Sequence, residues 1–258
     1  MARVVATLKE WRQAMDGYPV EASTVVATSA VRDAGNREEF VDLVARETGF
    51  HVEIISGEDE ARRTMLGIRS GLPPGVTDLL ALDIGGGSTE FILDRPGQSP
   101  VVRSIDIGVV RLCERLLHHD PPTSEEIQSA REWVATDTAA AVAGMPRPAA
   151  LTCVGTAGTI TALAAMAQEL PAYEPARIHN YVLTLETVKG LEMQLLSRSK
   201  VQREGLPGLE RGREDVIAAG AIIFSTVLET LGNKECLVSD LGLREGVLLH
   251  LAGQWKRP

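Results

Sequence analysis

Apolar residues follow two alternating patterns along the chain. Short runs rich in Val, Ile and Leu are typical of buried strands, whereas longer stretches with apolar residues every three or four positions are typical of amphipathic helices. The pattern predicts strands at Thr24–Thr28, His51–Ile55, Asp78–Ile84, Thr89–Asp94, Val101–Asp106, Ala150–Val154 and Glu235–Val238. It predicts helices at Val4–Asp16, Asn36–Thr48, Ser56–Ser70, Gly108–His118, Ser124–Gly144, Thr159–Gln168, Leu185–Ser197, Glu214–Leu231 and Leu243–Ala252.

The order of these elements indicates an α/β protein. Three strands joined by short turns are followed by alternating helices and strands, which favours a mixed sheet covered by helices. The clearest linker is Gly71–Gly75, which reads Gly-Leu-Pro-Pro-Gly. This linker predicts a domain boundary.

Composition narrows the functional class. The 258 residues carry a net charge of −9, which argues against general affinity for nucleic acid or anionic membranes. No apolar run approaches the about 20 residues needed to span a bilayer, and no signal-peptide pattern is present. The three cysteines are isolated, which gives neither a disulfide framework nor metal-ligand spacing. We therefore expect a soluble protein of the reducing cytoplasm.

The most informative segment is Leu82–Glu90, which reads Leu-Asp-Ile-Gly-Gly-Gly-Ser-Thr-Glu and includes the end of an apolar strand. Three consecutive glycines let a backbone turn bring its N–H groups close to a phosphate, because no Cβ stands in the way. Asp83 and Glu90 flank the turn, and such carboxylates suit a divalent cation or an attacking water. A plain hairpin turn is the alternative interpretation, but it needs neither the acids nor the hydroxyls of Ser88 and Thr89.

A second glycine motif lies where a strand ends and a helix begins, at Cys-Val-Gly-Thr-Ala-Gly-Thr-Ile. Gly155 and Gly158 free the backbone, and Thr156 and Thr159 supply hydroxyls. The helix N-terminus offers N–H groups and the positive end of a dipole to an anion. The alternative is a glycine turn with Thr159 as the N-cap. Two phosphate-type turns in one α/β unit favour phosphate binding.

Five segments resemble, in order and interval, the motifs of the exopolyphosphatase/guanosine pentaphosphate phosphohydrolase (Ppx/GppA) family. The resemblance covers nearly the whole chain. The segments are Ala27–Arg32, Ile55–Arg62, Leu82–Glu90, Val154–Ala162 and Ser239–Gly246.

The resemblance implies the two-domain fold of actin, the heat-shock chaperone ATPases and the sugar kinases. This ribonuclease H-like α/β fold has its active site in the cleft between the domains. On this basis residues 1–75 are what remains of domain I, residues 76–241 form domain II, and residues 242–258 form a helix that packs back on domain I.

The resemblance also implies roles for individual residues. Glu60 matches the catalytic glutamate that positions or deprotonates the attacking water, whereas Glu58 and Asp59 fit the electrostatics of a first helical turn. Arg32 matches a phosphate-binding arginine, a role that suits its planar donors. Asp83 matches a metal-binding acid and Glu90 an acid that acts on the water or the metal. The phosphate loop matches Gly85, Gly86, Gly87 and Ser88, and the opposite loop matches Gly155, Thr156, Gly158 and Thr159.

The chain departs from the family in two places, and two further residues have open roles. Family members begin with a strand that carries Asp-x-Gly-Thr/Ser-Asn-Ser and two further strands, whereas this chain opens inside the expected first crossover helix, so the first domain is incomplete. A start codon assigned too far downstream, a fragment and a degenerate relative all account for this. Asn180 stands where the family usually has glycine, and Arg213 and Asp215 fit capping or surface roles as well as substrate contacts.

The expected function is hydrolysis of a phosphoanhydride with Mg²⁺ or Mn²⁺ as cofactor. The substrate is inorganic polyphosphate or a guanosine penta- or tetraphosphate, and the family resemblance suggests a homodimer. The alternative is a non-catalytic phosphate- or nucleotide-binding relative, or an inactive fragment, that acts through a partner. Sugar kinase activity fits the motifs less well. Because the two strands of domain I have exposed edges, we expect the chain alone to aggregate and to hydrolyse little.

Overall fold

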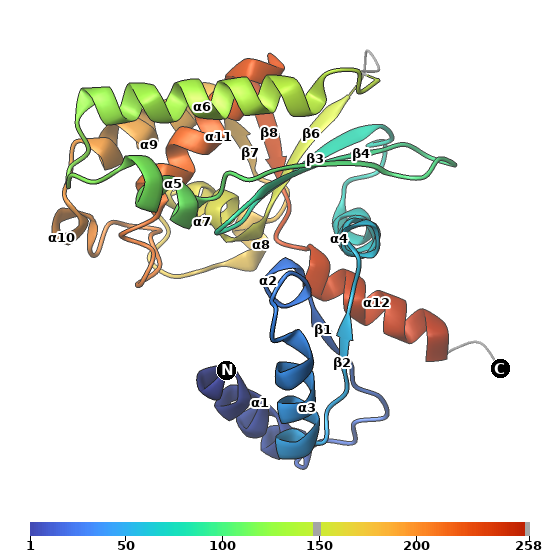
Figure 1. Ribbon diagram of the computed structural model, residues 1–258. Helices are drawn as coiled ribbons and strands as arrows, with labels where there is room; N and C mark the ends of the chain where they lie inside the picture. Colours follow the sequence, from blue (N-terminus) through green and yellow to red (C-terminus); the bar gives the residue numbers. More distant parts are fainter. Residues whose placement is uncertain (147–150, 256–258) are drawn as a thin grey trace. The chain divides into compact units, whose positions relative to one another are not determined.

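The computed structural model describes residues 1–146 and 151–255, with the backbone alone for residues 254 and 255. The chain divides into two compact units (Figure 1). Unit 1 comprises Met1–Gly67 and Leu243–Pro258, and unit 2 comprises Ile68–Gly242. The boundary lies inside helix α4 (Gly57–Gly71) and not at the Gly71–Gly75 linker, because the helix continues without a break to Gly71.

Unit 1 contains a two-stranded parallel sheet with helices around it. The strands β1 and β2 pair in register, with Val25 opposite Val52 and Ala27 opposite Ile54. Its small core gathers Val5 and Leu8 with Val44 and Phe50, three of which come from helices. The elements of unit 1 are α1 (Ala2–Met15), β1 (Val25–Ala27), α2 (Ser29–Arg32), α3 (Arg37–Thr48), β2 (Val52–Ile54), the larger part of α4, and α12 (Leu243–Trp255).

Local sequence explains where the helices of unit 1 start and stop. Ser56, the first residue of the helix predicted here, accepts a hydrogen bond of 3.1 Å from Asp59 N on its Oγ and so caps the start of α4. Helix α3 ends at Gly49, whose φ of 73° is left-handed and suits glycine. Asn36, the first residue of the helix predicted here, lies just before α3 and makes no side-chain cap hydrogen bond.

Unit 2 is built on a six-stranded mixed sheet in the order β5-β4-β3-β6-β8-β7. The three consecutive strands β3, β4 and β5 are antiparallel, and β6 then pairs parallel with β3. This arrangement confirms the predicted mixed sheet. The strands are β3 (Leu79–Ile84), β4 (Thr89–Asp94), β5 (Val101–Ile105), β6 (Thr152–Thr156), β7 (Val182–Thr184) and β8 (Glu235–Val238).

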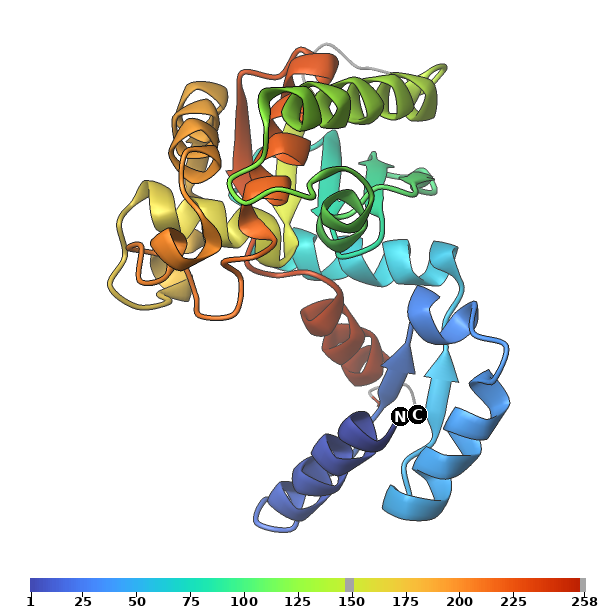
Figure 2. The same cartoon turned by 60° about the vertical axis from the view of Figure 1, so that its left-hand side comes forward.

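Helix α11 forms the centre of the helical layer of unit 2. Its sequence is apolar on nearly every side, which is typical of a fully buried helix, and it contacts α5, α6, α7 and α9 (Figures 1 and 2). The helices are α5 (Val109–Leu116), α6 (Ser124–Val142), α7 (Ala157–Ala167), α8 (Pro175–Ile178), α9 (Leu185–Leu196), α10 (Lys200–Arg203) and α11 (Ile217–Leu231).

The differences from the predicted elements are short or terminal. The sequence pattern missed β7, α2, α8 and α10, each of three or four residues. Helix α6 begins at Ser124, as predicted, behind a capping box formed by Thr123 and Glu126. Helix α7 begins at Ala157 and not at Thr159. Ala150, the predicted start of a strand, lies outside the described residues.

The three cysteines are free, as the sequence predicts. Cys153 Sγ and Cys236 Sγ lie 3.6 Å apart on neighbouring strands without a disulfide. Burial raises the pKa of Cys236 well above its usual value, and the neighbouring Cys153 thiol adds to the shift. Its thiol therefore stays protonated. Among the helices in the described part of the chain, none is long and apolar enough to cross a membrane.

Candidate phosphate-binding site

A row of oxygen-bearing side chains crosses four strands of the sheet in unit 2. Glu90 on β4 is paired directly with Asp83 on β3, and Asp83 is paired with Thr156 on β6. Directly paired residues point to the same face of a sheet. On the other side Glu90 is paired with Ser104, whose Oγ donates a hydrogen bond of 3.1 Å to Glu90 Oε1. The structure therefore brings both predicted carboxylates to one surface, with a hydroxyl on each side.

The first glycine turn connects β3 to β4 and is held by the N-terminus of α5. Gly85 O accepts from Val109 N at 3.0 Å, and Gly86 O accepts from Val110 N at 2.9 Å. In a trans peptide the N–H points opposite to the C=O. The N–H groups of Gly86 and Gly87 therefore point away from α5.

The fold itself does not require glycine at positions 86 and 87. A Cβ on Gly86 would lie 3.5 Å from Val110 Cγ2, and one on Gly87 would lie 3.7 Å from Arg111 Nη2, which are ordinary contacts. Neither residue has a left-handed φ. The glycines at this turn are therefore consistent with close approach of a ligand to the backbone.

Gly108 packs directly against the backbone of the first turn, although its sequence position did not indicate this role. A Cβ there would lie 2.4 Å from the carbonyl carbon of Gly86 and 2.5 Å from the nitrogen of Gly87. Both are backbone atoms that cannot rotate aside. The only signal in the sequence was a glycine directly before a helix.

The second glycine turn follows β6 and opens α7. Ala157 adopts a left-handed φ of 65°, a strained value for a residue with a Cβ. Thr159 does not cap the helix, because its Oγ1 donates a hydrogen bond of 3.0 Å to Ile84 O at the end of β3. The residue at the N-cap position is Thr156.

The two turns lie side by side and not opposite one another. They follow neighbouring parallel strands, β3 and β6, and the bond from Thr159 to Ile84 joins them. The expectation that Gly155–Thr159 forms the opposite loop is therefore wrong. Neighbouring parallel strands run in the same direction and end at the same edge of a sheet, so the turns that follow them are neighbours.

Each of the two glycine turns has an arginine side chain next to it. Arg111 lies beside the first turn, where its backbone N–H donates to Gly86 O, and its side chain forms an ion pair of 3.0 Å with Asp106. Arg213 lies over the second turn, since a Cβ on Gly158 would come within 2.5 Å of its Nη1. Both side chains are partly exposed. Sequence reasoning missed Arg111 and left Arg213 open, because the turns and the arginines are far apart in the chain.

The segment after β8 is tied to the second turn. Ser239 N donates to Gly155 O at 2.7 Å, and Thr156 Oγ1 donates to Leu241 O at 3.2 Å. Asp240 in this segment accepts a hydrogen bond from Tyr173. Burial and this bond raise the pKa of Tyr173 to about 12. The motif that begins at Ser239 thus belongs to the surroundings of the second turn.

In unit 1 the structure brings Arg32 and Glu60 together. Arg32 Nη1 donates to Glu60 Oε2 at 3.3 Å and to Ile55 O at 2.9 Å. Each of the two charged side chains keeps about a third of its surface exposed, at 29% and 30%. In the same helical turn, a hydrogen bond from Arg62 lowers the pKa of Asp59, so Asp59 is an ordinary surface acid.

The donor set in unit 2 fits a hard divalent cation. Asp83 and Glu90 offer carboxylate oxygens and Thr156 a hydroxyl, and Mg²⁺ is commonly bound by one or two carboxylates together with substrate phosphates. No group of three or more His, Cys, Asp or Glu side chains suited to a metal is found within residues 1–146 and 151–253. Asp83, Glu90 and Thr156 are the residues of this surface whose chemistry would suit such an ion together with a phosphate ligand.

Taken together, these features describe an α/β protein whose mixed sheet carries a pair of carboxylates beside two glycine turns. The chain belongs to the Ppx/GppA phosphatase family, whose sequence model matches residues 1–254. The predicted resemblance is thereby confirmed.

Named relatives and solved structures agree with this membership. Exopolyphosphatase 2 of Mycobacterium tuberculosis is 36% identical over 269 residues, a match that covers 98% of this chain and 82% of the relative. The crystal structure of the Aquifex aeolicus family member is 34% identical with a TM-score of 0.87, covering 100% of this chain and 82% of that chain. An exopolyphosphatase structure from Cytophaga hutchinsonii is 28% identical with a TM-score of 0.85, covering 98% of this chain and 82% of that one. These likenesses confirm the predicted fold class.

Proposed function

We propose that this protein removes terminal phosphate groups from inorganic polyphosphate. Relatives named exopolyphosphatases support this assignment at the level of the family. Guanosine pentaphosphate presents the same terminal phosphoanhydride and is the second substrate we propose. Both are flexible polyanions, and since the chain has a net charge of −9, local groups must hold them.

The observation that carries the proposal is the first glycine turn. Two backbone N–H groups, those of Gly86 and Gly87, point away from α5 beside the row that contains Asp83 and Glu90. The guanidinium of Arg111 lies near the same turn. Outward N–H groups and a partly exposed arginine are the donors that phosphoryl oxygens require.

The site residues of unit 2 would then position the phosphate chain. The turn at Gly85–Ser88 binds one phosphoryl group, and the turn at Gly155–Thr159 with Arg213 binds another. Asp83 and Glu90 would hold Mg²⁺ or Mn²⁺, which when bound neutralises charge on the phosphoryl oxygens. Phosphoryl transfer depends mainly on such positioning and charge stabilisation.

Glu60 is the general base of this proposal, and Arg32 is its partner. A carboxylate that takes a proton from the attacking water must be held in one orientation, and the 3.3 Å contact with Arg32 Nη1 supplies this constraint. Arg32 has further donors with which to meet phosphoryl oxygens.

The test is the release of phosphate from long-chain polyphosphate by Glu60→Gln. We expect a loss of about 10²–10⁴-fold in turnover, because the amide cannot accept the proton. The matched control is Glu58→Gln, which removes an acid from the same helical turn and should leave the rate unchanged. If Glu60→Gln retains the parental rate while folding normally, Glu60 is not the base.

The alternative function is that of a non-catalytic protein that binds phosphate through the two glycine turns of unit 2. Polyphosphate binding that depends on Mg²⁺ and on Asp83, without phosphate release, would establish this alternative. Release from pppGpp but not from polyphosphate would reassign the substrate.

We also propose a cytoplasmic location, which the free cysteines support, and a homodimer, which the family resemblance implies. Sedimentation of the purified chain would test the dimer.

A further inference from the structure

Arg213 lies in an irregular connection, residues 204–216, between α10 and α11. Its guanidinium covers the second glycine turn, because a Cβ on Gly158 would lie 2.5 Å from both Nη1 and Nη2 of Arg213. The side chain keeps 36% of its surface exposed. Irregular connections adopt several conformations unless neighbouring parts of the protein hold them. The position of Arg213 therefore depends on the contacts that surround it.

The contact that reaches this connection from the interior comes from Arg203, the last residue of α10. Its side chain is buried, with 4% of its surface exposed. Arg203 Nη1 donates a hydrogen bond of 3.0 Å to Glu214 O, the carbonyl that follows Arg213 in the chain. Arg203 Nε donates another, of 2.9 Å, to Leu195 O near the end of α9. Because a guanidinium is planar and rigid, these two bonds fix the carbonyl of Glu214 relative to α9.

Arg203 is itself held in one orientation. Its Nη2 forms an ion pair of 3.5 Å with Asp120 Oδ1, and Asp120 Oδ2 accepts a hydrogen bond of 2.7 Å from Lys200 N. A capping box formed by Ser199 and Gln202 begins α10. The guanidinium therefore has fixed partners on each of its three nitrogens.

Two further bonds hold the same segment, residues 212–215. Glu214 Oε2 accepts a hydrogen bond of 2.7 Å from Gly212 N, and Asp215 O accepts one of 3.5 Å from Cys113 Sγ of α5. Together with the bond from Arg203, they fix the backbone on both sides of Arg213.

A buried arginine is a costly way to stabilise a fold. A buried charge loses its hydration, and apolar side chains of similar volume often replace buried ionic groups without loss of stability. A guanidinium can nevertheless donate to two carbonyl groups in fixed directions, which an apolar side chain cannot do. The charge of Arg203 therefore fits a role in setting the course of the backbone at Glu214.

We propose that Arg203 is a positioning residue, which holds residues 212–215 so that the guanidinium of Arg213 covers the second glycine turn and meets phosphate there. The inference rests on the phosphate-binding role proposed above for Arg213. Arg203 is buried and acts through Arg213 alone.

The test is the affinity for tripolyphosphate, measured by calorimetric titration. Arg203→Met fills much of the same volume but donates no hydrogen bond. We expect at least about a fivefold rise in Kd, because a displaced Arg213 loses charge-assisted hydrogen bonds to the phosphate.

The matched control is Arg131→Met. Arg131 of α6 forms an ion pair of 2.7 Å with the buried Glu192 of α9, also in unit 2. Loss of this arginine leaves a buried carboxylate without its cation and should lower the melting point. The Kd for tripolyphosphate should nevertheless stay within about twofold of that of the parent, since distant sites act independently.

A double-mutant cycle separates positioning from a general structural role. Arg213→Ala alone should raise the Kd. Addition of Arg203→Met to Arg213→Ala should change the Kd by less than about twofold, because the residue through which Arg203 acts is then absent. Arg203→Lys retains the charge but lacks the planar fork, and its Kd should lie between those of the parent and Arg203→Met. If Arg203→Met does not fold, Arg203→Lys takes its place in the cycle.

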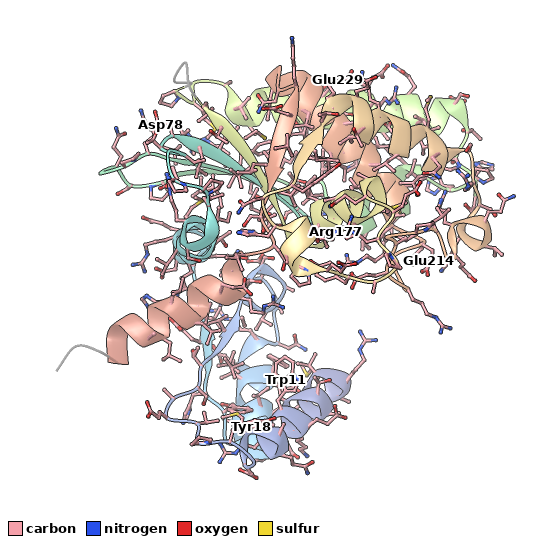
Figure 3. All side chains as sticks on the ribbon, turned by 180° about the vertical axis from the view of Figure 1, so that it is seen from behind. Trp11, Tyr18, Asp78, Arg177, Glu214 and Glu229 are labelled. Carbon is pink, nitrogen blue, oxygen red and sulfur yellow. The ribbon has the colours of Figure 1, made fainter. Side chains whose placement is uncertain are left out.

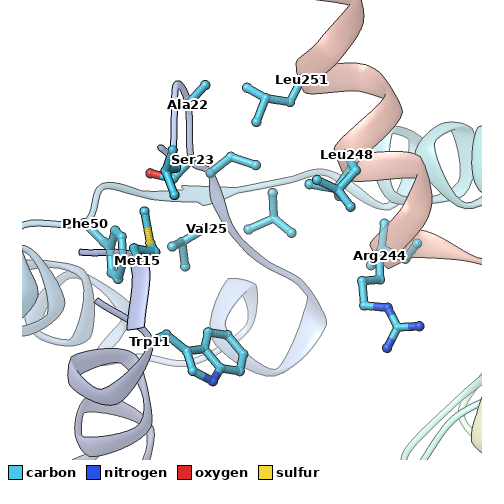
Figure 4. A pocket seen from close by; sticks show the side chains of 14 residues that line it. Trp11, Met15, Ala22, Ser23, Val25, Phe50, Arg244, Leu248 and Leu251 are labelled. Atoms are coloured by element: carbon cyan, nitrogen blue, oxygen red, sulfur yellow. The ribbon is translucent and has the colours of Figure 1, made fainter. Parts of the chain in front are cut away.

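Leu248→Ser in unit 1 is a control for the measurement itself. Leu248 lies on α12 in an apolar groove that Trp11 and Val25 also line (Figure 4). Among the residues that the structure describes, those that line this groove include neither Arg32 nor Glu60. The Kd of Leu248→Ser should therefore stay within about twofold of that of the parent.

Three results would overturn the inference and leave the proposed function intact. They are an unchanged Kd in both Arg203 variants, additive effects of Arg203→Met and Arg213→Ala, and an equal rise in Kd in Arg131→Met. An unchanged Kd in Arg213→Ala alone would instead show that Arg213 does not bind phosphate. The role proposed for the second turn would then fail, and the inference would fail with it.

Discussion

At the scale of single residues, glycines in and near the first turn have different physical roles. A Cβ on Gly86 would make only an ordinary contact with Val110, whereas a Cβ on Gly108 would overlap the backbone of the turn itself. The first is available to a ligand, and the second is required by the fold. Substitution by alanine separates the two roles.

Gly86→Ala should fold normally and bind phosphate weakly. The added Cβ finds ordinary contact with Val110, but it obstructs the approach of a phosphoryl group to the backbone N–H. A hydrogen bond to a charged group contributes about 1.5–3 kcal/mol, so we expect at least about a tenfold rise in Kd for tripolyphosphate. Calorimetric titration measures the Kd, and an unchanged Kd would show that the first turn does not bind the phosphate.

Gly108→Ala should destabilise the protein. Its Cβ would overlap backbone atoms of Gly86 and Gly87, and overpacking of this kind costs about 1–3 kcal/mol. The matched control is Gly190→Ala in the interior of α9, where nothing lies within 4 Å, and this change should stabilise by about 0.5–1 kcal/mol. The melting points of the two variants and the parent are measured by thermal unfolding. A Gly108→Ala melting point equal to that of the parent would contradict the prediction.

Asn180 illustrates how a departure from the family pattern is accommodated. The residue has a left-handed φ of 64°, which glycine adopts freely and which asparagine tolerates better than most other residues. Its Nδ2 also donates a hydrogen bond of 3.0 Å to Gly71 O, which a glycine cannot do. The substitution therefore retains the backbone conformation and adds a contact to the end of α4.

At the scale of elements, the capping box at the start of α6 contains a carboxylate whose contribution to stability depends on pH. Glu126 is partly desolvated, but it accepts hydrogen bonds from His119, from the N–H of Thr123 and from the N–H of His118. These bonds outweigh the desolvation and lower the pKa of Glu126 to about 2, from an ordinary value of 4.5. The ionised carboxylate is therefore part of the folded state.

The free energy of unfolding should fall as the pH drops from about 4.5 to about 2. A carboxylate whose pKa is lowered by folding stabilises the protein above its unfolded pKa, and this contribution is lost as protons bind. Glu126→Gln should be less stable than the parent at pH 6 and should approach it near pH 2. Glu125→Gln in the same turn is the control. Urea titration at several pH values measures the difference, and parallel curves for the parent and Glu126→Gln would contradict it.

At the scale of the whole molecule, the two units differ in how much core they contain. Unit 2 has a six-stranded sheet and a buried central helix, whereas unit 1 has two short strands and a small core. A two-stranded sheet is marginal in water. Unit 1 should therefore open more readily than unit 2.

Native-state hydrogen exchange should resolve this difference. We expect amides of β1 and β2 to be protected at least about tenfold less than those of β3 and β6, which corresponds to about 1.4 kcal/mol in opening free energy. Equal protection in the two units would show that the open edge of β1 does not limit the stability of unit 1. Exposed apolar side chains of unit 1, such as Trp11 and Tyr18 (Figure 3), also agree with the expected tendency to aggregate.

The sequence by itself determined most of the elements and the motifs that carry the chemistry. Hydrophobic periodicity and capping residues are local, so the long helices and the strands β3, β4 and β6 could be predicted from neighbouring residues alone. The glycine runs and the acids beside them were visible for the same reason, and the resemblance to one family rested on them.

Only the tertiary structure decided which of these residues lie together. Thr159 bonds to Ile84, Arg213 lies over Gly158, and Gly108 supports Gly86 across distances in sequence that no local pattern encodes. Strand β7 is three residues long and exists because it pairs with β8. These features depend on free energy gained between segments that are far apart in the chain, and folding alone brings those segments into contact.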